Sequence, residues 1–211
     1  MIRPCIAILL VLASLVSWSS ERPFSQADWD WTYKHFHPVL DELMPMQGTA
    51  AYVVYRAHSE SGVPEYWFVI GYDPNQGGHG LQKYLSAHVR IAESQSIFEQ
   101  IMRAHRSEPQ EDIASIEKRI KLRTFDLNEM TCPAMKEQVE MLEKVQVDVP
   151  KFHDPGVFVF GHPLKSEFHI QQGFQQMSVV LLDDDKLPHE NALHNWAFWT
   201  RRVLDGCAPG R

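Results

Sequence analysis

Short runs of apolar and β-branched residues predict a sheet in the first half of the chain. The stretches 49–56 and 65–72 are rich in valine, isoleucine and aromatic residues, and a polar turn separates them. After the glycine-rich loop 73–80, apolar and polar residues alternate over 85–91, which is typical of a strand with one buried face. These three segments predict an antiparallel three-stranded meander.

The second half of the chain repeats this texture. We predict strands over 157–160, 167–171 and 176–182, and a fourth in the basic, partly apolar stretch from Ile116 to Phe125. Short strands joined by turns favour antiparallel pairing. The predicted fold class is therefore α+β, an antiparallel sheet with helices packed on one side.

Apolar residues at helical spacing, preceded by capping residues, predict helices between these strands. The predicted helices cover 26–36, 38–44, 96–105, 133–145 and 188–204. We expect Pro38 to separate the first two, because proline lacks the backbone donor that a helix interior needs.

Residues 1–20 have the pattern of a signal peptide. Arg3 precedes an apolar run from Ile6 to Val16, and the small residues around Ser19 come just before a polar stretch. The run is shorter than the ~20 residues that span a bilayer. We expect cleavage near Ser20 and an extracytoplasmic protein, either periplasmic or secreted; an uncleaved N-terminal anchor is the alternative.

The remainder of the chain, 21–211, has the length of a single α+β domain. Its parts 21–106 and 116–211 each contain a strand–turn–strand unit with a helix on either side. Two related β-meander halves that arose by duplication are therefore an alternative to one undivided arrangement.

The charge pattern limits the partners of the protein. The formal net charge is -7, and the lysines and arginines do not form a continuous basic stripe. This pattern argues against nucleic acid and against anionic membrane surfaces as partners. We expect a protein or a cell-envelope component as partner, and no stable membrane span after cleavage.

Removal of residues 1–20 leaves two cysteines, Cys132 and Cys207. In an oxidising compartment they allow one pairing, so a disulfide between them is predicted. The alternative is that Cys132, at the start of a predicted helix, is a reactive thiolate.

The 11 histidines are the main candidates for polar chemistry. His58, His79 and His162 fall in or beside predicted turns, where they could form a polar site at one end of a sheet. His189 and His194 are five positions apart, whereas two zinc ligands on one helix face are four apart. We therefore predict no metal site and no cofactor, and the catalytic residues stay unknown.

Aromatic residues suggest a contact surface. Trp31 lies off the apolar stripe of the first predicted helix, and Phe198 and Trp199 cannot both hide on the stripe of the last one. Aromatic side chains are common anchors in binding surfaces, so these three residues form a candidate binding surface. Burial in the core is the alternative.

The chain has no sequence motif for a nucleophile elbow or a phosphate-binding loop. We therefore predict an exported binding protein of unknown ligand, such as an inhibitor, an immunity-type protein or an envelope-associated module. The alternative is a small secreted hydrolase, metal-assisted or not, with histidines and carboxylates from separate loops.

Overall fold

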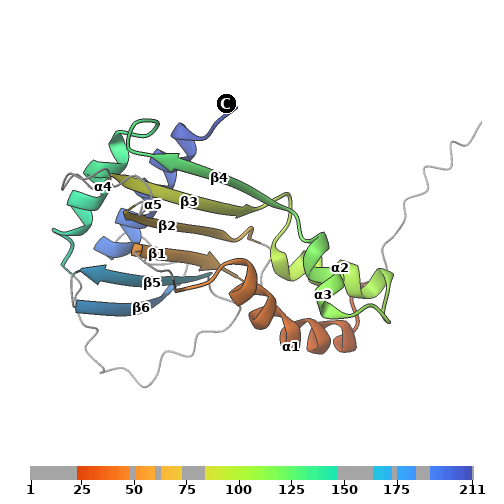
Figure 1. Cartoon of the computed structure of the whole chain (residues 1–211). Coiled ribbons are helices and arrows are strands. Elements are labelled where there is room, and N and C mark those ends of the chain that lie inside the picture. Colours follow the sequence, from red (N-terminus) through yellow and green to blue (C-terminus); the bar gives the residue numbers. More distant parts are fainter. Residues whose placement is uncertain are drawn as a thin grey trace, which may run out of the picture.

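The computed structural model describes residues 23–47, 51–59, 63–72, 84–146, 164–172, 175–183 and 191–210. Helices and strands alternate irregularly along this part of the chain, and Figure 1 shows one sheet with helices around it. In chain order the elements are α1 (Gln26–Leu43), β1 (Ala51–His58), β2 (Tyr66–Tyr72), β3 (Leu85–Ala92), α2 (Ile97–Ser107), α3 (Ile113–Arg119), β4 (Leu122–Asn128), α4 (Ala134–Leu142), β5 (Leu164–Gln172), β6 (Gln175–Asp183) and α5 (Ala192–Cys207). The predicted α+β class is confirmed.

The six strands form one sheet in the order β4-β3-β2-β1-β5-β6, and every neighbouring pair is antiparallel. The predicted meander is β1, β2 and β3. The hairpin β5–β6 pairs with the free side of β1, while β4 pairs with β3. Strands from both predicted halves therefore belong to a single continuous sheet.

One face of the sheet packs against α4 and α5. Tyr55, Phe68 and Phe168 point into this core, where the rings of Phe68 and Trp196 lie 6.0 Å apart. The Trp196 indole Nε1 donates to the carbonyl of Gln138 on α4 at 2.7 Å, so its one polar atom is satisfied although it is buried.

A second core lies on the other face and joins α1, α2 and α3 to one end of the sheet (Figure 1). Val54 and Trp67 contribute from the strands, and Phe36 and Phe98 contribute from α1 and α2. Helices thus lie on both faces, whereas the sequence suggested one. The apolar stripes of α1 and α2 face each other as well as the sheet, a relationship that periodicity within one segment does not reveal.

Two predicted elements differ in continuity or in type. Helix α1 continues through Pro38, because Phe36, Val39 and Leu40 on either side of it are buried in the same core. The start of the predicted 116–125 strand is instead helix α3, capped by Asp112, whose side chain accepts from the Ser115 backbone at 2.9 Å.

The predicted disulfide joins Cys132, just before α4, to Cys207, the last residue of α5. Its Cα atoms lie 5.5 Å apart. The bond ties the two helices of one core together and leaves the Cys132 sulfur without the thiolate that a nucleophile needs. The predicted strand 157–160 lies outside the described residues, and within those residues no helix is both long and apolar enough to cross a membrane.

Candidate functional site

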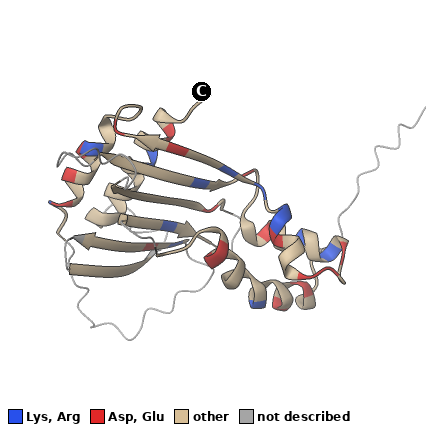
Figure 2. Ribbon diagram, in the orientation of Figure 1, with Lys and Arg blue, Asp and Glu red and all other residues tan. Residues whose placement is uncertain are grey.

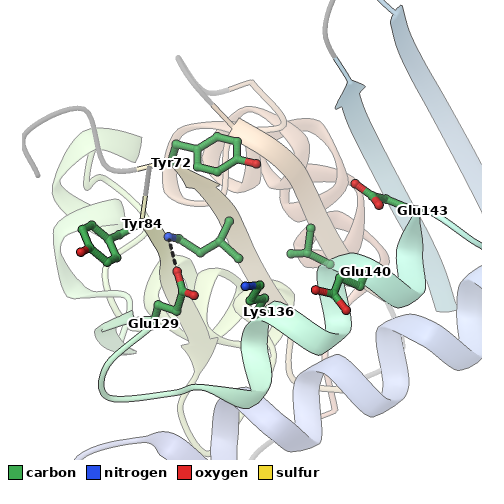
Figure 3. Close-up of a pocket in the computed structure, with 8 residues that line it drawn as sticks. Tyr72, Tyr84, Glu129, Lys136, Glu140 and Glu143 are labelled. Atoms are coloured by element: carbon green, nitrogen blue, oxygen red, sulfur yellow. Dashed lines mark hydrogen bonds between the residues drawn. The ribbon is translucent and has the colours of Figure 1, made fainter. Parts of the chain in front are cut away.

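A cavity of about 340 Å³ lies between α4 and the adjoining ends of β2 and β3 (Figure 3). Its walls come from four parts of the chain: the end of β2, the start of β3, the turn after β4, and α4 with its C-cap. The lining residues are Tyr72, Tyr84, Leu85, Glu129, Lys136, Val139, Glu140 and Glu143. The volume is at the lower end of the range for ligand pockets, so it suits a small molecule.

The sequence positions these walls through ordinary helix and sheet geometry. Tyr72 pairs with Leu85 in the β2–β3 ladder, so the residues at this end of the hairpin are neighbours in space. On α4, Val139 is buried against the sheet while Lys136 and Glu140, four apart, point to the same side. Polar groups of the helix therefore meet the end of the sheet.

The cavity is acidic. Three glutamates and one lysine line it, so negative charges exceed positive ones by two. In Figure 3 the Lys136 ammonium lies between the carboxylates of Glu129 and Glu140, and Glu143 lies at the far end of α4 from Glu129.

Two of the carboxylates are held in position by protein groups. The Tyr52 hydroxyl donates to Glu143 Oε1 at 3.1 Å, and the backbone N–H of Leu85 donates to Glu129 Oε2 at 3.3 Å. Burial and the neighbouring Glu143 carboxylate raise the pKa of Tyr52 to about 12. Tyr52 therefore remains a hydrogen-bond donor to Glu143 at any physiological pH.

The lining groups define a chemistry. Carboxylates form charge-assisted hydrogen bonds with ammonium groups, and the face of a tyrosine ring attracts a cation. Leu85 and Val139 add an apolar wall. In Figure 3 the Tyr72 hydroxyl points towards the α4 side of the cavity, whereas the Tyr84 hydroxyl points away from the other labelled side chains. This arrangement suits an organic cation with a small apolar portion.

The predicted polar site does not coincide with this cavity. His58 is the last residue of β1, at the opposite end of that strand from Ala51, which pairs beside Tyr72. The His58 ring is buried, and its Nε2 atom lies 3.4 Å from Glu167 Oε1. His79 and His162 lie outside the described residues, so whether they approach His58 stays a prediction.

The predicted binding surface separates into two places. Phe198 and Trp199 are 47% and 52% exposed on α5, with ring centroids 5.5 Å apart and the Arg202 guanidinium over both rings. Trp31 instead stacks on His105 between α1 and α2, at 3.8 Å between centroids. The structure therefore brings Phe198 and Trp199 together and places Trp31 elsewhere, and the binding role of all three residues stays a prediction.

A histidine–carboxylate pair of the kind that the hydrolase alternative would use lies on the sheet. His88 on β3 contacts Asp126 on β4 through Nδ1, and Arg90 Nε donates to its Nε2 at 3.2 Å. Both ring nitrogens are thus occupied, which leaves none to accept a proton from a substrate. Within the described part of the chain no three histidine, cysteine, aspartate or glutamate side chains gather as metal ligands. His189 is not among these residues.

Comparison of the chain with protein-family models, curated proteins and solved structures finds no match. The cavity was also missed by sequence reasoning. The available signal was the set of polar residues at 136, 140 and 143 on one predicted helix, together with tyrosines at both ends of a loop. Neither signal specifies that the helix lies against that loop.

Proposed function

We propose that this chain is an exported binding protein that holds a small organic cation in the cavity between α4 and the β2–β3 end of the sheet. The observation that carries the proposal is the fixed Glu143 carboxylate, which accepts from Tyr52 at one wall of a 340 Å³ cavity. A pre-positioned carboxylate loses little freedom when a ligand binds, which favours affinity.

The chemistry of the lining supports a cation over an anion. An anionic ligand would meet three carboxylates and a single ammonium, and like charges in a partly dehydrated site are costly. An ammonium group can instead pair with the carboxylates of Glu140 and Glu143, and the Tyr72 ring forms a further wall of the same cavity. Lys136 offsets one of the three negative charges of the lining and so limits the site to a ligand of low positive charge.

Export is part of the proposal. It is supported by the signal-like pattern of residues 1–20 and by the disulfide between Cys132 and Cys207, which is compatible with an oxidising compartment. The mass of the protein recovered from the extracytoplasmic fraction tests it. Cleavage near Ser20 and loss of the two thiol hydrogens are expected; an intact N-terminus with free thiols contradicts export.

Isothermal titration calorimetry with putrescine, choline and glutarate tests the ligand class. We expect heat from one or both cations and none from the dianion, with affinity that weakens as salt is added. Glu143→Gln removes the carboxylate but keeps the acceptor for Tyr52, so we expect at least a tenfold loss of affinity, since ~1.4 kcal/mol corresponds to tenfold.

Glu137→Gln is the matched control. Glu137 lies on α4, is exposed and does not line the cavity. The substitution Glu137→Gln changes the net charge of the protein by the same amount as Glu143→Gln. Equal loss of affinity in both variants would show that the overall charge, and not the cavity, attracts the cation; binding of glutarate alone would contradict the proposed ligand class.

A further inference from the structure

The outer edge of β6 differs from the other edge of the sheet. Strand β6 pairs with β5 over nine residues without a register shift, and in the described part of the chain no strand pairs with its outer side. Its sequence, from Gln175 to Asp183, contains no proline and no charged residue before Asp183. Charges, prolines and bulges are the usual protection of an edge strand, and β6 has none of them along its centre.

The opposite edge, β4, has the usual protection. It carries Arg123 and Asp126, one of each sign, within seven residues. Figure 2 shows this contrast, because β4 has coloured charged positions and the central part of β6 has none. The two edges of one sheet are thus built differently, and only β6 is suited to pair with another strand.

Exposed apolar side chains accompany the unprotected backbone. Val180 is 61% exposed and Met177 is 37% exposed, on opposite faces of β6. Val179 and Leu181 pack against the core under α4 and α5 but are only partly buried there. The apolar core therefore extends to the edge strand β6, where its side chains are partly exposed.

We propose that β6 pairs with β6 of a second copy of this chain, antiparallel and about a two-fold axis at Val179, so that two sheets become one. This inference is independent of the proposed ligand. Full overlap of residues 175–183 places Val179 opposite Val179 and Met177 opposite Leu181 of the second copy. Odd-numbered residues then meet odd-numbered residues, which keeps the core faces of both copies on the same side.

The strand is self-complementary in this register. Met177, Val179 and Leu181 form a continuous apolar row with their equivalents, and Ser178 lies opposite Val180 on the other face. Residues 175–181 of β6 carry no charged side chain, so no like charges face each other along this part of the pairing. Pairing therefore covers Val180 and Met177 and closes the core at the edge.

Sedimentation velocity of the mature protein over a range of loading concentrations tests the pairing. We expect a monomer–dimer equilibrium in the wild type and a shift to monomer in Val180→Lys, because a lysine on the edge opposes strand addition. The side chain at 180 is exposed and pairs with Glu167 across β5, so lysine is compatible with the fold. Far-UV circular dichroism checks that the variant is folded.

Thr124→Lys on the exposed position of β4 is the matched control and should leave the dimer intact. A thiol cross-linking test fixes the register. Oxidation to a disulfide should join two copies of Val179→Cys and not of Ser178→Cys. Residue 179 faces its own equivalent directly, whereas the two copies of residue 178 lie diagonally, about 7–8 Å apart and too far for a disulfide, and the native cysteines are already bonded. A wild type that stays monomeric at every concentration, a Val180→Lys variant that stays dimeric, or cross-linking at 178 instead of 179 would overturn the proposal.

Discussion

Arg56 and Glu167 face each other across β1 and β5, with the arginine Nε 2.6 Å from Glu167 Oε2. The guanidinium is almost fully buried and also donates to Asp41 Oδ1 at 2.6 Å and to the carbonyl of Met44 at 3.1 Å. One buried charge on β1 thus joins the end of α1 to β5. Because a buried charge without a partner is costly, the arrangement makes Glu167 a stabilising residue.

We expect Glu167→Gln to lower the free energy of unfolding by about 3 kcal/mol, because among the described residues it leaves the Arg56 charge paired with the exposed Asp41 alone. Urea denaturation at neutral pH measures the change. Asp126→Asn is the control: it also converts a carboxylate to an amide on this sheet, but Asp126 is exposed, so its effect should stay below about 0.5 kcal/mol. Equal effects would contradict the special role of Glu167.

Glu65 makes the stability of the protein depend on pH. Its carboxyl is fully buried, with Oε2 accepting from the Ile97 backbone at 2.6 Å, and burial raises its pKa to about 7 from an ordinary value of 4.5. A raised acid pKa means that the folded state holds the proton more tightly than the unfolded state. Stability from this residue is therefore present below pH 4.5 and is lost as pH rises to 7.

Glu167 changes the stability at pH values below 4.5, and with the opposite sign to Glu65. Burial by itself raises its pKa, but His58 and Arg56 outweigh burial and hold the pKa at about 2. Its contribution is present above pH 4.5 and is lost as pH falls towards 2. The two carboxyls together place the stability maximum near the ordinary glutamate pKa.

The test of the Glu65 contribution is Glu65→Gln, whose amide keeps an acceptor for Ile97 without a charge. We expect the wild type to lose about 3 kcal/mol relative to this variant between pH 4.5 and 7, from 1.36 kcal/mol per pKa unit. Urea denaturation across that range gives both curves. Parallel curves for the two proteins would show that Glu65 does not titrate in this window.

The disulfide contributes through the unfolded chain. Cys132 and Cys207 are 75 positions apart, so the bond closes a long loop and restricts the unfolded ensemble. We expect the double variant Cys132→Ala, Cys207→Ala to be less stable by about 4 kcal/mol. Thermal unfolding with and without reductant measures this: reductant should destabilise the wild type and leave the double variant unchanged. A wild type insensitive to reductant would contradict the prediction.

Local sequence signals predicted those parts of the fold that local physics determines. Alternation over 85–91 indicated β3, and the spacing of Leu193, Trp196 and Thr200 indicated α5. Both features depend on residues close in sequence. The cysteine pairing was also predictable, because the proposed compartment leaves one combination.

Long-range pairing could not be predicted in the same way. Arg56 read as an ordinary strand residue, yet it pairs with Glu167, 111 positions away. The acidic cavity has the same origin, since Tyr52 and Glu143 are separated by 91 positions. The prediction at Ile116 failed for a local reason. Its apolar side chain suited a strand, but Ile116 lies in helix α3, which Asp112 caps.

The two tryptophans of α5 lie in different environments, one in the core and one at the surface. Trp196 is 2% exposed, packs against Phe68 and donates to Gln138, whereas Trp199 is 52% exposed beside Phe198. We expect Trp196→Ala to lower the free energy of unfolding by about 3–5 kcal/mol, through the cavity it leaves and the lost hydrogen bond to the Gln138 carbonyl. Trp199→Ala should change it by less than about 1 kcal/mol, since the side chain is half exposed and loses only surface contacts with Phe198 and Arg202.

Chemical denaturation of both variants measures the difference, and acrylamide quenching of the wild type and Trp199→Ala reports the exposure of that indole directly. Exposed aromatic side chains lower the solubility of a protein. If Trp199→Ala leaves the free energy of unfolding unchanged, Phe198 and Trp199 are not needed for stability, and a contact role for them is favoured. A loss as large as that of Trp196→Ala would instead place Trp199 in the core, the alternative that the sequence left open.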